Sequence, residues 1–148
     1  MAIPQLNENG NLPEGVHTCS ESEIEERFGS FQRSDVRCRI FERLADYLTE
    51  LRATDAVSFV IVDGSFTTAK DEPGDIDLIV IFKSGHDFEA DLPPFAYNAL
   101  SKRSVRRTFG FDVLLAEEGN PEYDDYVSFF ARVRGEPNQF KGMLRIDL

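Results

Sequence analysis

A glycine–serine pair and two aspartates lie close together in the middle of the chain. Gly64 and Ser65 follow an apolar run almost directly, and after nine further residues Asp75 and Asp77 alternate with aliphatic residues at the start of the next run. A glycine lets the backbone approach a phosphate group closely, and a serine hydroxyl can donate a hydrogen bond to a phosphate oxygen. Two adjacent carboxylates repel one another, and Mg²⁺ bound between them removes that repulsion. The pattern therefore indicates a site for a phosphorylated ligand and a metal ion.

The two aspartates are predicted to lie on a strand over residues 75–82, which is apolar on both faces after its acidic start. Because side chains two positions apart on a strand point the same way, Asp75 and Asp77 are expected to project from one face. A third carboxylate, Asp112, opens a later strand-like run at 110–116 and is expected to converge on the same site. The alternative interpretation is that Asp75 caps a turn and Asp77 lies at a solvated strand end.

These motifs resemble the polymerase β-type nucleotidyltransferase superfamily, especially its minimal members. The resemblance covers residues 35–116 and rests on the hydrophobic–Gly–Ser turn, the nine-residue spacing and the Asp–hydrophobic–Asp–hydrophobic run. It implies that Gly64 and Ser65 contact the triphosphate of a nucleotide. It also implies that metal ions, Mg²⁺ or Mn²⁺, are bound by carboxylates that are at once the metal-binding and the catalytic residues: Asp75, Asp77 and Asp112. The opening residues 12–17 and the run 64–70 also resemble a group of uncharacterised prokaryotic proteins with this core.

The chain departs from the superfamily pattern at two points near the motif. Minimal members often carry an Ala-Arg-Gly run soon after the Gly-Ser pair, and this chain has Phe-Thr-Thr-Ala-Lys at 66–70 instead. Lys70 is therefore expected to replace the arginine as a nucleotide-binding charge, without the fork geometry of a guanidinium group. Gly74 stands where those members often have a serine.

The leading functional hypothesis is a metal-dependent nucleotidyltransferase that moves a nucleoside monophosphate from a nucleoside triphosphate to a hydroxyl on a protein, an RNA or a small molecule. The alternative is a catalytically inactive protein of the same fold that binds a protein partner, for example in a toxin–antitoxin or defence pair. A metal-dependent phosphate hydrolase is a third interpretation, which the Gly-Ser spacing disfavours.

The charge balance bears on the class of partner. The net charge of −11, with 27 acidic and 16 basic residues, argues against an extended surface for nucleic acid, which needs a cationic face. A basic cluster at 102–107 is interpreted as a solvated helix face. No apolar stretch approaches the length that spans a bilayer, so no membrane contact is expected. Two cysteines without CxxC spacing and the absence of a signal-like start predict reduced thiols and a cytoplasmic location.

The predicted architecture is a single α/β (α+β) domain with a mixed sheet flanked by helices. Residues 1–19 are expected to form an arm packed on the domain, and residues 20–148 the domain itself. Ser20 and Glu23 form a capping box that starts a short helix, and Ser34 is the expected N-cap of a long helix whose Arg37 faces solvent. The other expected elements are a strand at 56–62, a helix at 92–106, a helix starting at 120–121 with Tyr126, Phe129 and Phe130 on its packed face, and a last strand within 142–148.

Overall fold

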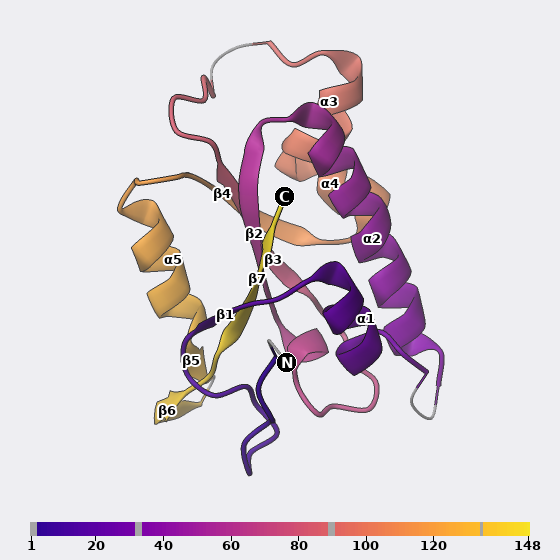
Figure 1. The fold of residues 1–148 in the computed structure, drawn as a ribbon, viewed down its shortest axis with the longest axis vertical. Coiled ribbons are helices and arrows are strands. Elements are labelled where there is room, and N and C mark those ends of the chain that lie inside the picture. The colour runs from indigo at the N-terminus through magenta and orange to yellow at the C-terminus, as the bar shows by residue number, and fades with distance from the viewer. Residues whose placement is uncertain (1–2, 32–33, 89–90, 134) are drawn as a thin grey trace.

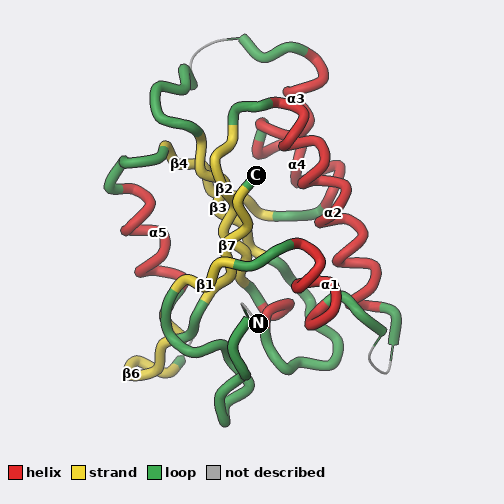
Figure 2. The backbone as a smooth tube through the Cα atoms, viewed as in Figure 1, coloured by secondary structure: helices red, strands yellow, loops and turns green. Residues whose placement is uncertain are grey.

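The computed structural model describes residues 3–31, 34–88, 91–133 and 135–148. It shows a five-stranded mixed sheet with helices on both faces, and a separate two-stranded hairpin (Figures 1 and 2). The prediction of a single mixed α/β domain with helices flanking the sheet is therefore confirmed.

The five-stranded sheet has the strand order β1-β7-β2-β3-β4. The pairs β1–β7 and β3–β4 are parallel, and the pairs β2–β7 and β2–β3 are antiparallel. The strands are β1 (Val16–Thr18), β2 (Val57–Asp63), β3 (Asp77–Phe82), β4 (Asp112–Glu117), β5 (Arg132–Val133), β6 (Glu136–Phe140) and β7 (Met143–Asp147). The helices are α1 (Glu21–Phe28), α2 (Val36–Thr54), the 3-10 turn η1 (Ser65–Thr67), α3 (Pro94–Leu100), α4 (Lys102–Phe109) and α5 (Glu122–Phe130).

Helices α1 to α4 cover one face of the sheet, and α5 with the β5–β6 hairpin lies against the other (Figure 1). Alternate residues of β2 and β3 serve the two faces, as strand geometry requires. Val60, Val62 and Val80 pack on the side of α2, whereas Ile61 and Ile79 pack on the side of α5. Beyond the irregular start of β2, the odd-numbered side chains of β2 and β3 therefore face α5, and the even-numbered ones face α2.

Local sequence signals explain the two N-terminal helices. The capping box predicted from Ser20 and Glu23 is present in both directions, because the serine oxygen accepts from the Glu23 amide and the glutamate accepts from the Ser20 amide. Helix α2 buries an apolar stripe at three- and four-residue spacing against the sheet. Its N-cap position falls on Asp35 rather than on the predicted Ser34, and Asp35 makes no capping hydrogen bond with its side chain.

The helix predicted at 92–106 is wrong in its continuity, since the structure has two helices there, α3 and α4. The break lies at Ser101, whose extended backbone (φ −92°, ψ 121°) ends α3. Its side chain then accepts a hydrogen bond from the Ser104 amide and caps α4. Serine competes with the helical backbone in this way, which is why it favours caps over helix interiors.

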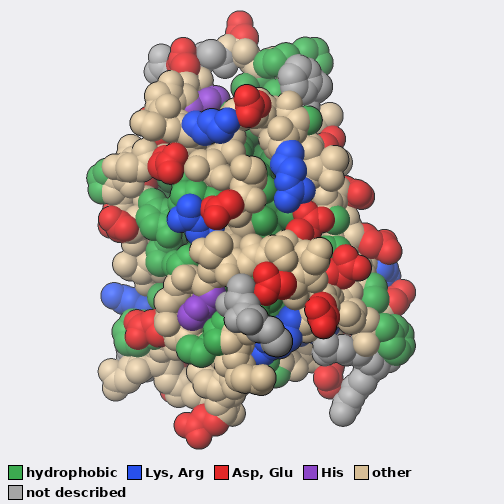
Figure 3. All heavy atoms as spheres, in the orientation of Figure 1, with side chains coloured by type: hydrophobic (Ala, Val, Ile, Leu, Met, Phe, Trp, Pro, Cys, Tyr) green, Lys and Arg blue, Asp and Glu red, His purple; other side chains and the backbone are tan. Residues whose placement is uncertain are grey.

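Charged side chains are mixed over the surface. Figure 3 shows acidic groups scattered over the face that it displays, with lysine and arginine groups set among them. Within the described residues, none of the helices has both the length and the apolar character needed to cross a membrane.

Candidate functional site

Three carboxylates stand side by side at one end of the sheet. Asp63 is the last residue of β2, Asp77 is the first of β3, and Asp112 is the first of β4. Asp63 pairs directly with Asp77, and Asp77 pairs directly with Asp112. Directly paired residues on neighbouring strands project from the same face, and here it is the face covered by α5. Asp112 and Asp77 thus share a face, and Asp63 extends the row although the sequence analysis gave it no role.

Asp75 lies outside this row, because it precedes the first residue of β3. The strand therefore begins two residues later than predicted, although Asp75 and Asp77 line one cavity while Ile76 and Leu78 are buried in the core on the α2 side. The Asp75 carboxylate accepts two hydrogen bonds at Oδ1, from the Ser65 hydroxyl at 2.6 Å and from the Ser65 amide at 2.7 Å. Burial opposes ionisation of Asp75, but these two hydrogen bonds, with Lys141 and Lys70 nearby, hold its pKa below the usual range. Asp75 closes a turn, as the alternative interpretation had it.

The Gly64–Ser65 turn packs directly against the start of β3. Gly64 has φ 92° and ψ −176°, a backbone conformation open essentially to glycine alone. A side chain at this position would place its Cβ 3.0 Å from both the Asp77 amide nitrogen and the Ile76 Cα. Ser65 joins the two ends of the loop, since its hydroxyl oxygen also accepts from the amides of Gly74 and Asp75. The turn and the aspartates are therefore one connected unit.

Arg37 on α2 holds the segment that follows this turn. It was predicted to face solvent, and that prediction is wrong, because the residue is only 1% exposed. Its guanidinium group donates hydrogen bonds to four backbone carbonyl oxygens, those of Phe28, Phe66, Thr68 and Lys70. Three of these carbonyls belong to residues 66–70, so the loop that leads away from Ser65 is tied to α2.

A cavity of about 520 Å³ opens over this unit. Its lining includes the carboxylates of Asp63, Asp75 and Asp77 and the Gly64–Ser65 turn. Residues from the end of α5 and from β5, together with Lys141 beside Asp63, complete the lining. Of the residues predicted from the sequence, the cavity is lined by Gly64, Ser65, Asp75 and Asp77.

Asp112 and Lys70 do not line the cavity. The Asp112 carboxylate is largely exposed and forms an ion pair with Arg106, from the basic cluster on α4. Lys70 is exposed, and its backbone carbonyl is one of the oxygens that Arg37 binds. The Asp75, Asp77 and Asp112 side chains are thus gathered at one end of the sheet, but in different surroundings.

Asp63 and Lys141 form a buried ion pair that the sequence analysis missed. The Lys141 Nζ lies 3.2 Å from Asp63 Oδ1, and the two side chains are 19% and 2% exposed. Both Asp63 oxygens are buried without a hydrogen bond of good geometry. Burial raises the pKa of Asp63 to about 6, although Lys141 acts in the opposite direction, and the neighbouring Asp77 raises it further. Asp63 directly precedes Gly64, which is a signal that could have found it, whereas nothing in the sequence marks Lys141.

The charge of Asp63 should make stability depend on pH. In the folded protein its pKa is about 6, against 3.8 for an ordinary aspartate carboxyl, so between these values only the folded state holds the proton. The proton on Asp63 therefore stabilises the folded protein fully below pH 3.8, and this stabilisation is lost as the pH rises through 6. We expect the unfolding free energy of Asp63→Asn minus that of the wild type to rise by about 2–2.5 kcal/mol between pH 4 and pH 8. Urea unfolding of both proteins across this range measures the difference, and a difference independent of pH would contradict the prediction.

The cavity residues suit a hard divalent cation. Carboxylate oxygens are the ligands that Mg²⁺ and Mn²⁺ prefer. Asp63 contributes two buried oxygens without good hydrogen bonds, directly across from Asp77, which is an arrangement that a cation would stabilise. Within the described residues, no three histidine, cysteine or acidic side chains are already gathered closely enough to hold an ion. A bound metal would therefore draw these carboxylates together.

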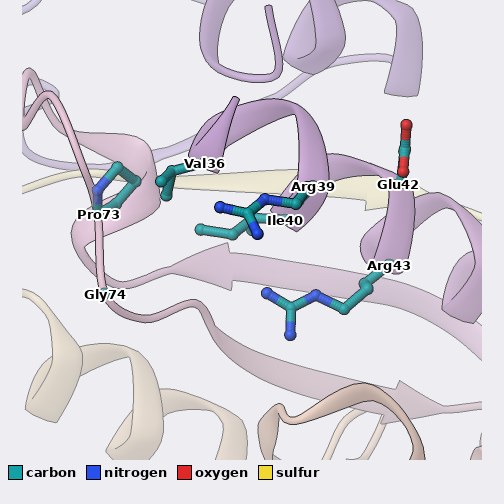
Figure 4. Close-up of a pocket in the computed structure, with 7 residues that line it drawn as sticks. All are labelled: Val36, Arg39, Ile40, Glu42, Arg43, Pro73 and Gly74. Atoms are coloured by element: carbon teal, nitrogen blue, oxygen red, sulfur yellow. The ribbon is translucent and has the colours of Figure 1, made fainter. Parts of the chain in front are cut away.

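A second cavity, of about 500 Å³, lies between α2 and the loop before Asp75 (Figure 4). Arg39 and Arg43 of α2 lie on one side of it, and Pro73 and Gly74 on the other. Its lining includes none of the three row carboxylates, nor Ser65. The cavity over Asp63 and Asp77 is therefore the candidate functional site.

Fold and site together define a mixed α/β domain with a cavity lined by acidic side chains at one end of its sheet. The chain belongs to a family of unknown function (DUF6932), whose sequence model matches residues 4–147. No curated protein and no solved structure matches the chain.

Proposed function

We propose that this protein is a metal-dependent nucleotidyltransferase, which moves a nucleoside monophosphate from a nucleoside triphosphate to a hydroxyl acceptor. The observation that supports this most is the row of carboxylates Asp63, Asp77 and Asp112, in register on three adjacent strands beside the Gly64–Ser65 turn. Gly64, which has no side chain, and Ser65 both line the cavity, so a ligand can approach the backbone of this turn closely. Phosphate oxygens and metal ions are the ligands that such a surface suits.

Each residue has a role that follows from its place. Asp77 and Asp75, with Asp63, would hold Mg²⁺ or Mn²⁺, which supplies charge to polarise the α-phosphate and to neutralise the leaving pyrophosphate. The Lys141 ammonium group lines the same cavity and can bind a phosphate oxygen. Asp112 lies at the exposed end of the row, where an acceptor hydroxyl can reach it from solvent and lose its proton to it. Most of the catalysis would come from positioning and electrostatics.

Asp77→Asn is expected to abolish metal-dependent binding of nucleoside triphosphates while the protein stays folded, because it removes the central carboxylate of the row. A ligand at a hundred times its dissociation constant stabilises a protein by about 2.7 kcal/mol. Wild-type protein should gain that much with Mg²⁺ and a triphosphate, and the variant should gain almost nothing. Thermal melts with each of the four ribonucleoside triphosphates measure this.

Asp46→Asn is the matched control, since Asp46 is exposed on α2 and does not line the cavity. It should respond to ligand as the wild type does. Incubation with α-labelled triphosphates then tests transfer, by label moved onto a protein, RNA or small-molecule acceptor. A wild-type melting temperature that ignores Mg²⁺ and all four triphosphates at millimolar concentration would exclude the proposed function.

A catalytically inactive binding protein is the second candidate function. Two contacts favour it: the Asp75 carboxylate is engaged by Ser65, and the Asp112 carboxylate is engaged by Arg106. In that case the protein binds a protein partner, as in a toxin–antitoxin or defence pair. Purification from the source organism would then recover a stoichiometric partner, and a variant lacking Asp75, Asp77 and Asp112 would still bind it. We expect either activity to be exercised in the cytoplasm, where free thiols such as Cys19 and Cys38 stay reduced.

A further inference from the structure

The lining of the cavity over the carboxylate row is of two chemical kinds. Asp63, Asp75 and Asp77 contribute acidic groups. Phe129, Phe130 and Val133, from α5 and β5, contribute apolar groups. Two cationic side chains, Lys141 and Arg132, line the same cavity. A ligand that fills it must therefore combine a strongly anionic, metal-binding part with a flat or apolar part.

Phe129 is the most exposed of these apolar residues. It was predicted to pack on the face of α5, and that prediction is wrong, because the residue is 71% exposed. Its neighbour Phe130 does pack against the sheet, and the two rings meet edge to face with their centroids 5.5 Å apart. Phe130 thus supports the Phe129 ring from one side and leaves much of that ring open to solvent. An exposed aromatic ring beside a phosphate-compatible site offers a surface on which a nucleobase can stack.

We propose that Phe129 stacks on the base of the bound nucleotide while Lys141 contacts its phosphates. This inference rests on the proposed function. It assigns a binding residue to the base of the nucleotide, which the carboxylates cannot recognise. Purines have the larger π-face, so the site should prefer them to pyrimidines. Stacking does not read the hydrogen-bonding edge of a base, so adenine and guanine should bind comparably.

The decisive experiment compares two probes that differ only in the nucleoside: ATP and inorganic tripolyphosphate, each with Mg²⁺. Wild-type protein should bind ATP more tightly than tripolyphosphate. Phe129→Ala should weaken ATP binding by about five- to 150-fold and leave tripolyphosphate binding unchanged, since base–aromatic stacking contributes about 1–3 kcal/mol per base. Phe129→Trp should keep the preference for ATP, and Phe129→Leu should lose it. Because Phe129 is exposed, all three variants should fold, and calorimetric titration measures their affinities.

Phe140→Ala is the matched control, because Phe140 is also exposed, at 44%, but does not line the cavity. It should leave both affinities unchanged. If Phe129→Ala keeps the wild-type preference for ATP, or weakens ATP and tripolyphosphate equally, the stacking role is wrong while the metal–phosphate site stands. If the wild-type protein binds neither probe with Mg²⁺, the stacking role and the proposed function fall together.

Discussion

Replacing Arg37 with methionine is expected to lower the free energy of unfolding by about 3–5 kcal/mol. Methionine keeps much of the apolar stem, so the loss comes mainly from the guanidinium group. That group donates to four carbonyl oxygens, and without it the carbonyls of Phe66 and Thr68 lose a charged donor. Hydrogen bonds to charged groups contribute about 1.5–3 kcal/mol each, although such contributions are not additive.

Arg39→Met gives the matched control, because Arg39 lies two positions along the same helix. Its side chain is 64% exposed and forms a surface ion pair with Asp35. That variant should change stability by less than about 0.5–1 kcal/mol. Urea unfolding at pH 7 measures both variants. Similar losses in the two would show that Arg37 does not hold the 66–70 loop.

The second large effect is expected from Gly64→Ala, which should destabilise the protein by about 3 kcal/mol or more and remove any ligand response. The backbone at Gly64 combines φ 92° with ψ −176°, and strain of this kind costs about 1–3 kcal/mol for other residues. The new Cβ would in addition lie 3.0 Å from backbone atoms of Ile76 and Asp77, which cannot move without shifting the start of β3. Because Asp77 begins that strand, the strain would reach the site directly.

Gly85→Ala separates the cost of backbone strain from the cost of the close approach to β3. Gly85 also has a positive φ, 87°, but a Cβ there would meet nothing within 4 Å. Its cost should be limited to backbone strain, about 1–2 kcal/mol. Thermal melts with and without Mg²⁺ and ATP measure both variants. An equal loss in the two variants would mean that the close approach of Gly64 to β3 contributes nothing.

The elements that the sequence predicted best are those whose signal is local. Helix α2 has a long periodic apolar stripe, and β2 and β3 are short apolar runs rich in β-branched residues. The capping box of α1 depends on two side chains three positions apart. In each case the residues that determine the element lie within it, so no knowledge of the fold was needed.

The site was predicted only in part, because its contacts join residues far apart in the chain. The Asp75 carboxylate is held by Ser65, ten positions earlier, and this contact keeps Asp75 in the loop before β3. Arg37 lies three and four positions before the buried Ile40 and Phe41, on the inner face of α2, but its charge is that of a surface residue. Only the folded structure shows that a later loop brings carbonyl oxygens to it. Lys141 directly follows the β5–β6 hairpin and pairs with Asp63. The two strands of that hairpin have no strong apolar alternation, so the sequence did not predict them.

The position of β7 in the sheet has a consequence for how the protein folds during synthesis. β7 follows the other four strands of this sheet in the sequence, yet it lies between β1 and β2 rather than at an edge. While residues 143–147 are still inside the ribosome, β1 lacks its partner and one side of β2 is unpaired. The helices can form locally in that time, but the sheet cannot close until residues 143–147 have left the ribosome. Pairing between segments so far apart in the sequence slows folding. Until β7 pairs with it, one edge of the apolar strand β2 is exposed and can associate with other chains.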